Sequence, residues 1–204
     1  MRFTLSEIPD GQFAGCQALV YSLLQRCENS EREDGYALAL VSAHPAAGVS
    51  HVRRLIELML NENEANCATS LDCDMLGVPE NTASDQADPR KKGQRNKKRR
   101  ALVRGQGLAR YRDRVGHLNR LREQYRFVLL DCHSLAERTD VLGLAPVVDG
   151  TITIVECNRT RISQVQELER NIEKYGGSIV GSVLNKTSST LPRWMNSFME
   201  KVGF

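Results

Sequence analysis

The sequence has no hydrophobic run long enough to cross a membrane. A membrane-spanning helix needs about 20 consecutive apolar residues, and no such run occurs in this 204-residue chain, although 41% of its residues are hydrophobic. The first residues, MRFTLSEIPDGQF, also lack the basic start and apolar core of a secretory signal. We therefore expect a cytoplasmic protein.

The cysteines form no C-x-x-C pair, which is the spacing typical of zinc and redox sites. There are six of them, at positions 16, 27, 67, 73, 132 and 157, and several lie within apolar segments. Cytoplasmic proteins keep such thiols reduced and often bury them as small apolar side chains. We therefore expect no structural metal.

Residues 77–109 lack the apolar side chains that a packed core requires. The segment begins with acidic and turn-forming residues and continues as RKKGQRNKKRRALVRGQG, which is strongly basic. A segment of this composition cannot bury enough apolar surface to offset its ordering entropy. We interpret 77–109 as a flexible basic loop within a single domain that spans 1–204.

The basic loop leaves two interpretations open. It is either a solvated linker or, through 90–104, an electrostatic contact with an anionic surface such as acidic lipid headgroups or a charged polysaccharide. No aromatic residue interleaves its charges, so it offers no platform on which bases could stack. We therefore do not expect sequence-specific binding of nucleic acid.

Elsewhere, short apolar segments alternate with segments of helical periodicity. The helical segments are 12–27, 51–60, 109–125, 161–176 and the residues after Pro192. The strand-like segments are 36–43, 67–75, 126–132, 147–157 and 177–185. Strands that are apolar throughout are typical of parallel sheets covered on both faces. The pattern predicts a doubly wound α/β fold with a mostly parallel sheet and helices on both faces.

The carboxyl ends of the predicted strands contain the candidate functional motifs. Ligands of doubly wound sheets bind at this edge, because the loops that leave the parallel strands meet there. The segments at these ends are 42–51, 71–75, 129–135 and 183–187.

These motifs resemble, in order, those of the cytoplasmic kinase domain of bacterial tyrosine autokinases of exopolysaccharide synthesis, relatives of the MinD/ParA group of P-loop ATPases. SAHPAAGVS at 42–50 resembles the phosphate loop S-A-x-P-x-x-G-K-S/T. LDCD at 71–74 resembles the second acidic motif I-D-A-D, and YRFVLLD at 125–131 resembles the Walker B strand. TDVLGLAPVVDG at 139–150 and GSVLNK at 181–186 match two later motifs. The resemblance implies a P-loop NTPase-like fold.

The resemblance also implies ligands and roles. ATP or ADP with magnesium is the implied cofactor. The implied nucleotide contacts are Pro45, Gly48, Ser50, His51 and Asn185. The implied magnesium ligands are Ser50, Asp72 and Asp131, and the implied catalytic carboxylates are Asp72, Asp74 and Asp131. The alternative is that these aspartates are solvated strand-end residues without a remaining role.

The phosphate loop departs from the pattern at two positions. Val49 stands where the lysine that holds the β- and γ-phosphates is expected, and Ala46 replaces the first loop glycine. A valine cannot supply the missing charge, and His51 or Arg53 could replace it only if preorganised. The chain also has no tyrosine after Tyr175, whereas such kinases phosphorylate a tyrosine cluster in their tail.

Three hypotheses follow. The first is a degenerate, non-catalytic regulator of exopolysaccharide synthesis or export, which docks on the cytoplasmic segment of a membrane chain-length or export protein and is recruited to the inner face of the membrane. The second is an active ATP-dependent tyrosine autokinase or ATPase with an atypical phosphate loop. The third is a nucleotide-independent scaffold that uses the basic loop.

Overall fold

The computed structural model describes residues 10–30, 32–63, 66–76, 107–138 and 140–186. The predicted basic loop lies outside these residues up to position 106, and its last three positions begin helix α4 (Gly107–Gln124). The predicted helix after Pro192 also lies outside them. No helix in the described part is both long enough and apolar enough to span a bilayer.

Five parallel strands form one sheet in the order β2–β3–β1–β4–β5. They are β1 (Tyr36–Ser42), β2 (Ala68–Asp72), β3 (Phe127–Asp131), β4 (Gly150–Glu156) and β5 (Ile179–Asn185). The first strand of the chain lies in the middle, between β3 and β4. The segment after β1 therefore leaves the sheet at its centre.

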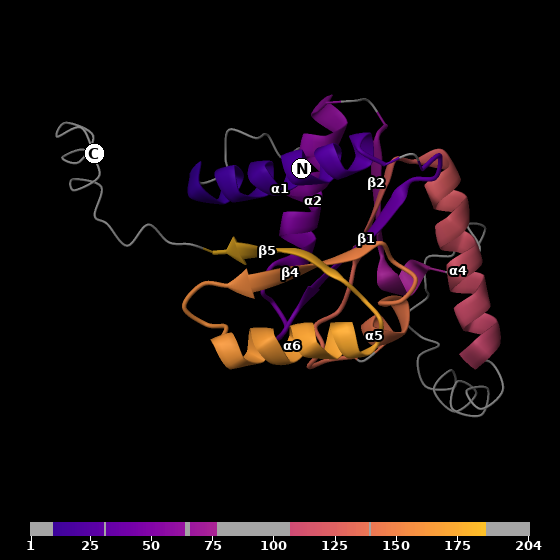
Figure 1. Ribbon diagram of the computed structural model, residues 1–204. Coiled ribbons are helices and arrows are strands. Elements are labelled where there is room, and N and C mark those ends of the chain that lie inside the picture. Colours follow the sequence, from indigo (N-terminus) through magenta and orange to yellow (C-terminus); the bar gives the residue numbers. More distant parts are fainter. Residues whose placement is uncertain (1–9, 31, 64–65, 77–106, 139, 187–204) are drawn as a thin grey trace, which may run out of the picture.

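Helices cover both faces of the sheet (Figure 1). On one face lie α1 (Asp10–Glu28) and α2 (Val49–Asn63). On the other face lie α4, α5 (Asp140–Leu144) and α6 (Ile162–Lys174). Because strand side chains alternate between faces, Leu38 and Leu40 of β1 pack toward α1 and α2, whereas Ala39 and Val41 pack toward α4–α6. The predicted doubly wound fold is confirmed.

The edge strands are less covered than their apolar sequence predicts. β1 at the centre is buried along nearly its whole length, but on β5 the Leu184 side chain is 52% exposed. An edge strand has a neighbouring strand on one side only, and α1 and α6 reach β5 without enclosing it.

A carboxylate joins the sheet to α4 at the amino ends of the strands. Asp149, directly before β4, accepts hydrogen bonds from the Ala37 backbone N–H (2.8 Å), from Arg122 Nη2 (2.7 Å) and from Arg32 Nη1 (2.5 Å). Burial alone would raise the pKa of this carboxyl, but the Ala37 hydrogen bond and the two guanidinium groups outweigh burial, so its pKa lies below the ordinary value. Asp149 thus links β1, β4 and α4, most strongly while it is ionised.

We expect Asp149→Asn to lower the free energy of unfolding at neutral pH by about 2 kcal/mol, because it weakens hydrogen bonds between charged groups. Since the folded state lowers the pKa, this stabilisation is present above the unfolded pKa of about 3.9 and is lost as pH falls through the folded value. Urea midpoints at pH 7 and at decreasing acid pH measure it.

Asp113→Asn, at an exposed position of α4, is the matched control and should change stability by less than about 0.5 kcal/mol. An equal loss in the two variants, or a difference that persists at acid pH, would contradict the role of Asp149.

Candidate phosphate-loop site

The loop between β1 and α2 has a backbone suited to anions. Ala46 and Gly48 adopt positive φ values of 63° and 90°, and α2 begins directly afterwards at Val49. A turn that alternates left- and right-handed residues before a helix N-terminus is typical of nests of backbone N–H groups that bind phosphate. The loop therefore keeps the shape of a phosphate loop, although its first expected glycine is an alanine.

A buried amide holds the loop in this shape. Asn185 at the end of β5 is 2% exposed, and its Nδ2 donates a 2.7 Å hydrogen bond to the Ala47 carbonyl. A Cβ at position 48 would lie 2.2 Å from this Nδ2, so both the positive φ and the close amide require glycine there. Asn185, predicted as a nucleotide contact, instead contacts the loop backbone and does not line the adjoining pocket.

The residue after β5 also contacts the loop backbone. Lys186 Nζ donates to the Ala46 carbonyl (2.6 Å) and lies 3.1 Å from Glu156 Oε1 at the end of β4. On the same side of the loop, His44 Nε2 lies 2.8 Å from Thr160 Oγ1. The ammonium group of Lys186 is thus engaged by the loop carbonyl and by a carboxylate.

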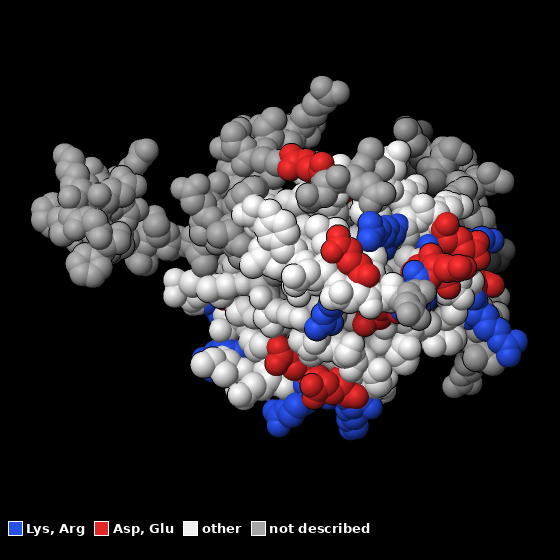
Figure 2. Space-filling view, turned by 45° about the horizontal axis from the view of Figure 1, so that its top comes forward, with Lys and Arg blue, Asp and Glu red and all other residues white. Residues whose placement is uncertain are grey.

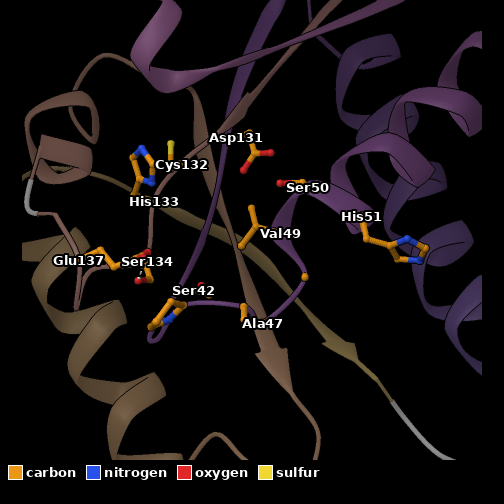
Figure 3. A pocket seen from close by; sticks show the side chains of 13 residues that line it. Ser42, Ala47, Val49, Ser50, His51, Asp131, Cys132, His133, Ser134 and Glu137 are labelled. Carbon is orange, nitrogen blue, oxygen red and sulfur yellow. Dashed lines mark hydrogen bonds between the residues drawn. The ribbon is translucent and has the colours of Figure 1, made fainter. Parts of the chain in front are cut away.

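A pocket of about 390 Å³ opens between the loop and the segment after β3 (Figure 3). It is lined by the loop and helix residues Ser42, Pro45, Ala46, Ala47, Gly48, Val49, Ser50 and His51, and by Asp131, Cys132, His133, Ser134 and Glu137. The predicted nucleotide contacts other than Asn185 are therefore brought together. Figure 3 shows the His51 ring directed away from the other labelled side chains.

Val49 lies within this pocket, where a phosphate-binding lysine was expected. It is the first residue of α2, is 9% exposed, and packs in the core between the sheet and α1 and α2. Figure 3 places it between the loop and Asp131. Among the described residues that line the pocket there is no lysine or arginine, so nothing placed there carries a permanent positive charge.

Asp131 has a cationic neighbour from outside the pocket lining. Arg53, four residues after Val49 on α2, places Nε 3.4 Å from Asp131 Oδ2 and Nη1 3.4 Å from Glu57 Oε2. Glu57 in turn accepts a 2.5 Å hydrogen bond from Ser70 Oγ of β2. The sequence suggested that Arg53 could contact a phosphate, whereas the structure places it beside a carboxylate.

The second acidic motif forms its own cluster. Asp72 pairs in register with Asp131 in the sheet but does not line the pocket, and its Oδ1 accepts a hydrogen bond from the Asp74 backbone in η2 (Cys73–Met75). Asp74 contacts Arg138 Nη1 (2.6 Å) and His133 Nε2 (3.1 Å). Of the three predicted catalytic carboxylates, Asp131 alone lines the pocket.

The Asp74–His133 contact changes the pKa values of both groups. Burial raises the pKa of Asp74, but the His133 hydrogen bond and the nearby Arg138 charge outweigh it and lower the pKa overall. The same hydrogen bond raises the pKa of His133. Potential ligand atoms of Asp72, Asp74 and His133 lie within 4.8 Å of one another, but Asp74 already has a guanidinium partner.

The surface charges are mixed on the face seen in Figure 2. Lysine and arginine side chains of the described residues lie interspersed with aspartate and glutamate there. That face offers no extended patch of a single sign within the part of the chain that the structure describes. The predicted anionic contact through 90–104 lies outside the described residues and stays a prediction.

Comparison with known proteins finds similar structures. No model of a protein family matches the sequence, and no curated protein does. The VpsO kinase domain has a TM-score of 0.56 at 16% identity, over 85% of this chain and 96% of that one. The kinase domain of the Escherichia coli tyrosine kinase Etk has a TM-score of 0.55 at 16% identity, over 94% and 86%. The BceF tyrosine kinase domain has a TM-score of 0.56 at 14% identity, over 85% and 75%. The predicted likeness to bacterial tyrosine kinase domains is confirmed for the fold.

We expect Ala46→Gly to raise the free energy of unfolding by about 0.5–1 kcal/mol. A residue with a Cβ is strained at positive φ, and glycine removes this strain. The free energy gained exceeds the cost of the extra conformational entropy that glycine gives the unfolded chain. Urea denaturation measures the change. Ala136→Gly is the control, because this exposed turn residue has no positive φ, and it should be neutral or destabilising. A loss of stability in Ala46→Gly would contradict the strained loop.

Proposed function

We propose that this protein is a non-catalytic relative of the bacterial tyrosine kinase domains and acts as a regulatory component of exopolysaccharide synthesis or export. One observation carries the proposal. Val49, which the motif resemblance aligns with the phosphate-binding lysine, lines a pocket whose described lining has no lysine or arginine. The functional part of the proposal comes from the motif resemblance, and the non-catalytic part comes from this pocket.

Phosphoryl transfer depends almost entirely on positioned charge. The transferring group spreads negative charge over its oxygens, and a fixed lysine and a metal ion stabilise that charge in the transition state. Removal of one preorganised donor typically costs on the order of 10²–10³ in rate. Val49 offers no such donor, and Lys186 is held by the Ala46 carbonyl and by Glu156. The described pocket lining therefore supplies no side-chain cation for the transferring group.

The retained architecture favours a docking role. The loop backbone, the Asn185 hydrogen bond and the pocket are present although the described pocket lining has no lysine or arginine. A folded module with this shape can contact a partner without chemistry. By the resemblance, the partner we propose is the cytoplasmic segment of a membrane chain-length or export protein, which would recruit this protein from the cytoplasm to the inner face of the membrane.

A second candidate function rests on a specific observation. Ser50 and Asp131 line the same pocket, as magnesium ligands of a nucleotide site would. This pair favours an active ATP-dependent tyrosine autokinase or ATPase with an atypical loop. The two candidates differ in whether the protein binds and uses nucleotide.

We expect calorimetric titration of the wild-type protein with magnesium-ADP and magnesium-ATP to show no detectable heat, because the pocket offers no cation to the phosphates. The variant Ala46→Gly/Val49→Lys should gain nucleotide affinity by on the order of tenfold, since one charge-assisted hydrogen bond contributes about 1.5–3 kcal/mol. Ala46→Gly/Val49→Met is the matched control, because methionine adds length without charge, and it should show no gain.

Micromolar binding by the wild-type protein, or autophosphorylation in magnesium-ATP that is lost in Asp131→Asn, would reject the non-catalytic role and support the enzyme. A folded lysine variant without any gain would show that the pocket itself no longer accepts nucleotide.

A further inference from the structure

Arg53 connects the pocket carboxylate to a second carboxylate on the same helix. Its guanidinium lies 3.4 Å from Asp131 Oδ2 at one nitrogen and 3.4 Å from Glu57 Oε2 at another. The side chains of Arg53 and Asp131 are only 13% and 16% exposed. Solvent and salt therefore screen this pair less than they would a surface pair.

The guanidinium is hydrogen-bonded through Nη1 to Glu57, whereas its buried Nε beside Asp131 has no hydrogen-bond partner among the described residues. Glu57 lies one helical turn after Arg53, and Ser70 Oγ of β2 donates a 2.5 Å hydrogen bond to the Glu57 carboxylate. Arginine stays protonated at every physiological pH. The chain thus keeps a permanent positive charge beside Asp131, positioned by α2 and β2.

A magnesium ion does not fit this arrangement. Magnesium requires near-octahedral oxygen ligands at about 2.0–2.1 Å, with one or two carboxylates supplied by the protein. An ion on Asp131 and Ser50 would stand next to the Arg53 charge and repel it. If Arg53 moved away instead, Glu57 would lose its partner in a partly buried site, which is costly.

The other candidate carboxylate has the same kind of partner. Arg138 Nη1 lies 2.6 Å from Asp74 Oδ1. Two of the three predicted aspartates, Asp131 and Asp74, thus each face an arginine of this chain, whereas Asp72 accepts a hydrogen bond from the Asp74 backbone. The pairing at Asp131 is the more buried of the two, and it alone adjoins the phosphate loop.

We infer that Arg53 is a resident cation that takes the place of a divalent metal ion at Asp131, so that the loop pocket excludes magnesium. The inference goes beyond the proposed function, because it concerns the protein without nucleotide and depends neither on Val49 nor on a role in polysaccharide synthesis. Arg53 acts as a positioning residue that fixes the charge state of the pocket.

The test is direct binding of manganese, a paramagnetic substitute for magnesium, to the full chain without nucleotide. Electron paramagnetic resonance of free Mn²⁺ should show no ion bound at the Asp131 site of the wild-type protein. Arg53→Gln should gain an ion there, with affinity raised by on the order of tenfold, the scale on which neighbours of metal ligands alter metal affinity. The gain should vanish in Arg53→Gln/Asp131→Asn, which distinguishes this site from the Asp74 cluster.

Two matched variants control for charge and for position. Arg53→Lys keeps the positive charge and should show no gain. Arg54→Gln removes a charge from the next, exposed position of α2 and should also show none. If Arg53→Gln does not unfold cooperatively, Arg53→Gln/Glu57→Gln removes both members of this ion pair and should show the same gain.

Mn²⁺ binding by the wild-type protein that is lost in Asp131→Asn overturns the inference. So does the absence of a gain in a folded variant that lacks Arg53. The Mn²⁺ experiment contains no nucleotide, so its result does not depend on the nucleotide titration. The inference about Arg53 and the proposed non-catalytic role can therefore fail independently of each other.

Discussion

The pairing of β1 with β3 on one side and β4 on the other is the constraint on which the site depends. It places the turn after Ser42 at the centre of the sheet, next to the end of β3 at Asp131 and close to the end of β5 at Asn185. The order of the parallel strands therefore determines where the loop lies and why Asp131 and Asn185 lie beside it. Substitutions within the loop can change its chemistry without changing this framework.

That framework determines the backbone shape of the loop independently of the charge of its side chains. The backbone of the loop is determined by the positive φ at positions 46 and 48, by the helix that follows, and by the Asn185 hydrogen bond to Ala47. The charge depends on single side chains, and Val49 is an ordinary core residue at the start of α2. The backbone geometry of the loop therefore does not depend on the side chain at position 49, and similarity of fold alone does not establish an activity.

The sequence predicted the fold well because hydrophobic periodicity and composition determine each helix and strand from residues that are close in the chain. The five strands, the helices on both faces and the position of the loop follow from apolar segments that alternate with helical ones, and Asp131 lines the pocket with Ser50 as the motifs indicated. The sequence did not predict the partners of the acidic residues. Arg53 and Asp131 are far apart in the chain, and Arg138 and Asp74 belong to different strand ends, so these contacts exist only once the sheet has formed. A local signal for Arg53 was present, since it lies four residues after Val49 and hence on the same side of α2.

Several acidic residues at the strand ends have cationic partners within the chain. A site that had lost only its lysine would still hold unpaired carboxylates at the strand ends, and such groups attract metal ions or repel one another. In this chain Asp131 lies beside Arg53, Asp74 beside Arg138 and Glu156 beside Lys186. Each of these three carboxylates is thus stabilised by a cation of the chain itself, whereas Asp72 at the end of β2 accepts a hydrogen bond from the Asp74 backbone. These pairs form only in the folded domain, because the two partners of each come from different elements of the chain.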